Sequence, residues 1–347
     1  MVLPGHLSSV DSAGARSDIR AFAPSIRHIV TKIRLPSRLQ DRNLPRFVEE
    51  LGAGNAGDQV EVDFGALKFA EPGCLVALLA KTQWWLRKKQ TPVVFSNAAA
   101  CGAFTYLQRQ DFFAHCGVEL EEKFLRHDAA GRFLEIREIG EGASAAQIAT
   151  GLATCIAPDL ADEWDAERTG LFDYVEYALS EVALNVEQHS LSRGFAMAQA
   201  YENSDEVHLG IADFGIGIKD SFCRYGSPHV TAEMSDLEAI RKAIAPKVSS
   251  KTHLATAWGE SANAGVGLTL LTALASRVGG QITIISGTGA VLLGREVVLP
   301  EERAYAGTIF AMSFPRAKVV NFAQLFADAK VELGLIKRDG GVPGMFE

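Results

Sequence analysis

The sequence predicts an α+β protein of two domains, a small α/β domain followed by a larger α/β sandwich in which helices cover one face of a mixed sheet. Between residues 26 and 126, strand-like and helix-like segments alternate, as is typical of a small α/β domain. After Gly194 the expected strands are separated by few residues, which favours antiparallel or mixed pairing because parallel neighbours need long crossovers.

The first domain is expected to follow a loose leader, residues 1–25, which is rich in Ser, Ala, Gly and Pro. Its strands and helices are expected at residues 29–35, 41–51, 59–64, 73–90, 91–96 and 104–113. The strand at 59–64 is the clearest of these, because Val60, Val62 and Phe64 alternate with polar residues and fall on one face.

The second domain, residues 127–317, is expected to hold a long helix, several closely spaced strands and one long polar stretch. In chain order its elements are a strand at 133–139, helices at 145–157 and within 164–190, strands at 195–202 and 206–212, a polar stretch at 219–263, a helix at 268–278, and strands at 281–286, 290–299 and 307–314. Residues 318–347 are expected to form a short amphipathic helix and a glycine-rich tail.

Composition excludes several classes of protein. With 347 residues, of which 48% are hydrophobic, the chain can fill two cores. It has no apolar stretch of about 18 residues, so no membrane span is predicted. A net charge of −8 argues against nucleic acid as a partner. Five widely spaced cysteines favour free thiols in a cytoplasmic protein, and no histidine motif predicts a transition-metal site.

The first motif with chemical meaning lies in the long helix. Glu181, Asn185 and His189 are each four residues apart, so they follow one flank of the helix. A carboxylate and a carboxamide one turn apart suit Mg²⁺, and the carboxylate can deprotonate a hydroxyl or water that attacks a phosphate. The alternative is that Glu181 and His189 are ordinary surface residues and that Asn185 makes a local hydrogen bond.

The second motif is an apolar strand that ends in Asp213 and continues with Gly215 and Gly217. A buried aspartate at a strand end can accept a hydrogen bond from an exocyclic amino group such as that of adenine. Glycines beyond it would let the backbone approach a flat ring. The alternative is an ordinary β-turn.

Two further glycine motifs follow. In the sequence Gly265-Val266-Gly267-Leu268 a glycine turn opens a helix, where free N–H groups and the helix dipole favour phosphate. Taken alone, such a turn is a common way to begin a helix. Thr308 follows Gly307 in a late strand and carries less information by itself.

The order and spacing of these four motifs resemble the GHKL superfamily of ATPases over about residues 140–317. The resemblance implies Mg²⁺·ATP as ligand, Glu181 as catalytic carboxylate, Asn185 as Mg²⁺ ligand and Asp213 as the residue that reads adenine, assisted by Thr308. Residues 265–268 would hold the phosphates. The polar stretch would be the ATP lid, and its members Lys247, Ser249, Ser250 and Lys251 could reach the terminal phosphate or be a solvated loop.

The Glu-x₃-Asn-x₃-His spacing is most similar to that of anti-sigma-factor serine kinases, and the first domain resembles the STAS domains that such kinases phosphorylate. The STAS-like turn departs from the family, because Glu71 stands where the family has Asp, and Pro72-Gly73 replaces its two serines. This domain would therefore dock or regulate rather than accept phosphate. An unrelated small α/β domain is the alternative.

Three functions remain open. The chain could be a serine/threonine kinase-like protein that acts on a protein partner related to STAS domains or sigma factors. It could instead be a slow ATPase that works as a conformational switch, or a nucleotide-binding scaffold without turnover. The sequence leaves a homodimer open.

Overall fold

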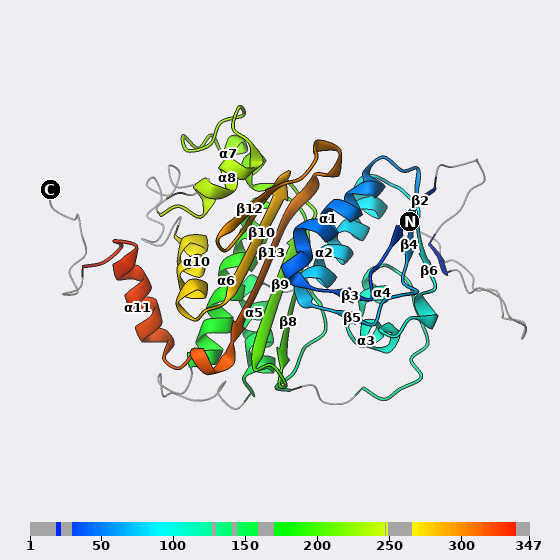
Figure 1. Ribbon diagram of the computed structural model, residues 1–347, viewed down its shortest axis with the longest axis horizontal. Helices are drawn as coiled ribbons and strands as arrows, with labels where there is room; N and C mark the ends of the chain where they lie inside the picture. Colours follow the sequence, from blue (N-terminus) through cyan, green and yellow to red (C-terminus); the bar gives the residue numbers. More distant parts are fainter. Residues whose placement is uncertain are drawn as a thin grey trace, which may run out of the picture.

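The computed structural model describes residues 19–21, 30–126, 130–140, 144–158, 170–246, 248 and 266–337. It has mixed α+β architecture, with a four-stranded sheet in the N-terminal half and a seven-stranded antiparallel sheet in the C-terminal half (Figure 1). Helices from both halves lie between and outside these sheets.

The N-terminal sheet has the order β1-β6-β4-β2. Its strands are β1 (Ile19–Ala21), β2 (Val30–Arg34), β4 (Gln59–Asp63) and β6 (Val93–Ser96). The three later strands pair in parallel, whereas β1 pairs antiparallel with β6. Part of the expected loose leader is therefore an edge strand of this sheet.

The local patterns explain these elements. Val60 and Val62 of β4 are fully buried while their neighbours are half-buried, as the alternation predicts. Helix α1 (Leu44–Leu51) follows a short 3-10 turn, η1 (Asp41–Asn43), and buries its apolar stripe. The expected helix at 104–113 is broken into α3 (Phe104–Arg109) and α4 (Phe112–His115), because Asp111 between them adopts a left-handed conformation with φ 55°.

Helix α2 (Pro72–Gln83) is buried on every side. It starts with proline, whose missing N–H costs nothing at a helix N-terminus, and it continues into a π-helical turn at Trp84–Lys88. Its one basic residue, Lys81, is 1% exposed and donates to Asn55 Oδ1 at 2.6 Å. Burial lowers the pKa of Lys81 to about 7. A helix buried all round must have partners on two sides.

The C-terminal sheet has the order β12-β11-β10-β13-β9-β8-β7. Its strands are β7 (Arg137–Ile139), β8 (Gly194–Tyr201), β9 (Glu206–Asp213), β10 (Gln281–Gly287), β11 (Gly289–Leu292), β12 (Arg295–Val298) and β13 (Tyr305–Pro315). Every pair is antiparallel, so the expectation of a mixed sheet is corrected. The single strand expected at 290–299 is the hairpin β11–β12.

One face of this sheet is covered by α5 (Ala145–Ile156), α6 (Gly170–His189) and α10 (Gly267–Arg277) (Figure 1). Helix α11 (Phe322–Glu332) packs outside them, where its aromatic rings contact Tyr174 and Tyr177 of α6. Among the helices within the described ranges, none is both long and apolar enough to cross a membrane.

The other face of the sheet is also covered, which corrects the expectation of helices on one face only. Helix α2 lies across β8, β9 and β13 (Figure 1). A Cβ on Gly210 of β9 would lie 2.6 Å from the backbone nitrogen of Gly73, and one on Gly73 would lie 2.5 Å from the Cβ of Ala311. Glycine at both positions lets helix and strand approach backbone to backbone. One apolar cluster accordingly contains side chains from both halves.

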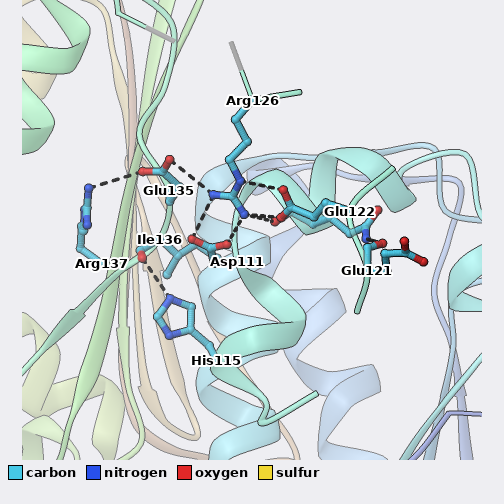
Figure 2. A network of polar contacts seen from close by, with 9 residues as sticks. Asp111, His115, Glu121, Glu122, Arg126, Glu135, Ile136 and Arg137 are labelled. Atoms are coloured by element: carbon cyan, nitrogen blue, oxygen red, sulfur yellow. Dashed lines mark hydrogen bonds and ion pairs between the residues drawn. The ribbon is translucent and has the colours of Figure 1, made fainter. Parts of the chain in front are cut away.

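The segment that joins the two halves is fastened by ion pairs. Arg126 contacts Asp111 and Glu122 at 2.5 Å each and Glu135 at 3.6 Å (Figure 2). Glu122 and Asp111 raise the pKa of Arg126 above its ordinary value. Close by, a ring nitrogen of His115 lies 3.0 Å from the carbonyl oxygen of Ile136. The chain before β7 is thus tied to helix α4.

Gly210→Ala should destabilise the whole chain, because the added methyl group must push α2 away from β9. Overpacking of this kind typically costs about 1–3 kcal/mol of unfolding free energy, which urea denaturation would measure. Gly151→Ala is the matched control. Gly151 lies in α5 with nothing within 4 Å of an added Cβ, so that change should stabilise by about 0.5–1 kcal/mol. Equal effects of the two substitutions would contradict the close approach.

Candidate functional site

Asp213 ends β9 and is 3% exposed. Its Oδ1 accepts the backbone N–H of Gly215 at 2.9 Å, and its Oδ2 accepts that of Thr308 at 3.1 Å. The backbone oxygen of Asp213 accepts the Tyr305 hydroxyl at 3.1 Å. The carboxylate is therefore fixed in orientation, and each of its oxygens retains a free acceptor site.

The two glycines after Asp213 are required by protein packing. A Cβ on Gly215 would overlap the carbonyl oxygen of Ser190, where α6 ends, and Ile216 N–H donates to that oxygen at 2.8 Å. A Cβ on Gly217 would lie 2.6 Å from the Oγ of Ser286. These contacts give the turn its shape, a reason different from the approach to a flat ring that the pattern suggested.

The late Gly-Thr pair lies directly beside Asp213. Gly307 has φ 93°, and a Cβ there would meet the Asp213 backbone, so the position needs glycine. Thr308 pairs across the sheet with Ser286 of β10. Ser286 is 2% exposed, accepts from Ile218 N–H at 2.8 Å and donates to the Gly307 oxygen at 3.1 Å. The sequence analysis missed Ser286, because a single serine in a strand has no motif.

Glu181 lies on α6, and its carboxylate reaches the start of α10. A Cβ on Gly267 would overlap the Oε2 of Glu181. The structure thus brings the helix motif and the second glycine motif together, and glycine is the residue that leaves room for the acid. Asn185 is half-buried one turn further along α6.

Helix α10 begins at Gly267 with Val266 as N-cap, and Val266 supplies no side-chain hydrogen bond to the first turn. The N-cap side chain therefore leaves the first N–H groups of the helix to other partners. Val266 is buried and Leu268 half-buried. Gly265 lies outside the described residues, as do the four lid candidates, residues 247, 249, 250 and 251.

The described part of the polar stretch is structured. It forms α7 (Ile218–Arg224) and α8 (Asp236–Ala243). Asp236 of α8 accepts from the backbone and hydroxyl of Thr288 at 2.8 and 3.0 Å, and Arg241 pairs with Glu296 of β12 at 2.5 Å. This half of the expected lid is docked on the edge of the sheet.

The two acids of the site have raised pKa values. Burial raises the pKa of Asp213 to about 7, although its two backbone hydrogen bonds act in the opposite direction. Burial also raises the pKa of Glu181, and a hydrogen bond with Tyr177 opposes this. Buried carboxylates with raised pKa values are often found at functional sites.

Far from this site, the structure brings together residues that no motif connected. Within the described part of the chain, Asp41, Glu71 and His208 form a buried group whose nearest nitrogen and oxygen atoms all lie within 4.8 Å of one another. Glu71 belongs to the STAS-like turn, and His208 belongs to β9. Their separation along the chain explains why the sequence analysis found no metal-ligand pattern.

Comparisons with models of known protein families, with curated proteins and with solved structures found no match. The site is therefore interpreted from its own geometry.

Asp213 should make stability depend on pH. The unfolded chain releases this proton near the ordinary pKa of 3.8 and the folded chain near 7, so the native state binds more protons between these values and loses stability as pH rises. Between pH 5 and pH 8, the free energy of unfolding measured with urea should fall by about 2–3 kcal/mol more in the wild type than in Asp213→Asn.

Asp220→Asn, which changes an exposed acid of α7, is the control and should track the wild type. If the difference in unfolding free energy between the wild type and Asp213→Asn is the same at pH 5 and pH 8, Asp213 is already ionised in the folded protein at pH 5.

Proposed function

We propose that this chain is a Mg²⁺·ATP-binding regulatory protein of the histidine-kinase-like ATPase type that acts on a protein partner. One observation carries the proposal. Four motifs that are scattered between residues 181 and 308 are joined by direct contacts, from Glu181 to Gly267, from Gly215 to the end of α6, and from Asp213 to Thr308. These contacts place residues from all four motifs in one part of the fold, which supports a shared site.

The adenine would bind at Asp213. Its carboxylate is held by two backbone N–H groups and still has acceptor capacity for an exocyclic amino group. Thr308 lies beside it, with its hydroxyl 3.5 Å from the Ser286 hydroxyl. The Thr308 hydroxyl would complete the hydrogen bonding of the ring, whereas the Ser286 hydroxyl already donates to the Gly307 oxygen.

The phosphates would bind at the first turn of α10, where the N–H groups are uncapped and the helix dipole favours negative charge. Glu181 occupies the same helix end. A carboxylate and a phosphate repel each other there unless a cation lies between them. Asn185 would supply an oxygen donor of the kind that Mg²⁺ prefers, and bound Mg²⁺ would neutralise the phosphate charge.

A conformational switch within the chain is a second candidate, and one contact path favours it. Tyr305 donates to the Asp213 backbone, and its ring lies 5.7 Å from the Lys81 ammonium of α2. A change at the adenine site can therefore reach the N-terminal half through Tyr305. The STAS-like turn offers no hydroxyl for phosphate and is covered by β9, which also favours a switch over transfer within the chain.

Asp213→Asn should weaken ATP binding by at least about tenfold, since a hydrogen bond to a charged group is worth about 1.5–3 kcal/mol. Isothermal titration with Mg²⁺ and a non-hydrolysable ATP analogue would measure it. Asp220→Asn should bind as the wild type does. Equal affinity for all three proteins would refute the adenine assignment.

Glu181→Gln should keep ATP affinity but lower turnover by about 10²–10⁴, the usual loss when a general base is removed. Turnover is followed with γ-labelled ATP, which separates phosphate released to water from phosphate on an added partner. Glu176→Gln is the control, because Glu176 lies on the same helix but bonds Thr150 instead. Wild-type turnover in Glu181→Gln would exclude Glu181 as the base.

A further inference from the structure

Three ligand-type side chains meet where the two halves of the chain join. Nδ1 of His208 lies 3.7 Å from Asp41 Oδ2 and 3.7 Å from Glu71 Oε2. The three residues are 7–9% exposed. They come from different elements, namely η1, the residue before α2, and β9.

The neighbours hold each ligand atom in place. Asp41 accepts the N–H groups of Gly73 and Cys74 at the start of α2 at 3.2 and 2.8 Å, and Glu71 Oε2 accepts the Asp41 N–H at 2.7 Å. On the other side of the imidazole, Nε2 lies 3.3 Å from Glu206 Oε2. A carboxylate behind a histidine is the arrangement that orients a metal-ligating imidazole and makes it more basic.

The His208 nitrogen that faces the two carboxylates is Nδ1. His208 Nδ1 is buried and has no hydrogen-bond partner, since 3.7 Å exceeds hydrogen-bond length. The hydroxyl of Tyr201, whose ring stacks edge-on against His208, is also buried without a partner. Buried polar atoms of this kind normally have partners, so two of them side by side mark a place for a ligand.

The charges favour a cation over an empty gap. Asp41 and Glu71 are two buried carboxylates that face the same imidazole nitrogen. The distances also suit an ion, because donors around tetrahedral zinc at about 2.0–2.1 Å lie about 3.4 Å from one another. The two carboxylates lie a few tenths of an ångström beyond this separation from His208 Nδ1, and all three ligand atoms lie within 4.8 Å of one another. The donors must therefore move closer together to contact one metal.

We propose that Asp41, Glu71 and His208 bind one divalent transition-metal ion, with zinc as the best fit, which ties the N-terminal half to strand β9. An imidazole with two carboxylates suits zinc, whereas Mg²⁺ prefers oxygen donors alone. This site is separate from the ATP site. Water would supply the fourth ligand.

The test is a titration of the metal-stripped full chain with Co²⁺, whose visible absorption reports tetrahedral coordination, and with Zn²⁺ followed by thermal unfolding. We expect one equivalent of Co²⁺ to saturate the signal and Zn²⁺ to raise the melting temperature. If the wild type shows neither effect, the proposal is overturned and the group is an imidazolium paired with two carboxylates.

Variants locate the ion. His208→Gln and Glu71→Gln, which keep hydrogen-bonding side chains, should lower Co²⁺ affinity by more than about 100-fold, and Glu206→Gln by about 10–100-fold. His229→Gln, Asp213→Asn and Glu181→Gln should leave it unchanged, which separates this ion from the one that accompanies ATP. Wild-type affinity in both His208→Gln and Glu71→Gln would overturn the proposal. Should either fail to fold, the wild-type titration and Glu206→Gln still decide it.

Discussion

The backbone-to-backbone approach of α2 and β9 at Gly73 and Gly210 determines how the rest of the chain is arranged. It places one helix between two sheets, so that the four-stranded sheet and the seven-stranded sheet share an apolar cluster. Asp41 caps α2 at the same point by accepting two of its first N–H groups. Helix end, strand and capping acid therefore hold one another in place, and a change at any of them affects both halves.

Much of the local structure could be predicted from the sequence, because local patterns determine it. Alternation gives β4, helical spacing gives α1, and Gly215 and Gly217 mark a turn that the structure contains. The spacing of apolar residues alone could not predict that a helix also covers the second face of the seven-stranded sheet. Strand β8 is almost continuously apolar, which indicates burial on both faces, but nothing in that run identifies α2 as the element on its far side. Gly73 and Gly210 lie too far apart in sequence for any local pattern to connect them.

In the candidate site, too, local sequence motifs predict some features, whereas others depend on contacts that form only in the folded chain. The residue types at Glu181, Asp213 and Thr308 follow from motifs, whereas their environment depends on burial and on contacts across the sheet. Burial leaves both acids less stable when ionised than they would be in water. A protein that buries such groups sacrifices some stability at these positions, as sites that bind ligands commonly do. Ser286 and the group around His208 have no motif and emerge only when the strands are paired.

The burial of α2 on two sides also has a consequence for synthesis of the chain. The helix leaves the ribosome well before β8, β9 and β13, the last of which ends at Pro315. At about 5–20 residues per second, its second face waits on the order of ten seconds or more for its cover. During that time an apolar helix surface is open to nascent-chain chaperones or to neighbouring chains. Translation speed between the two halves thus becomes a determinant of how much correctly assembled protein the cell obtains.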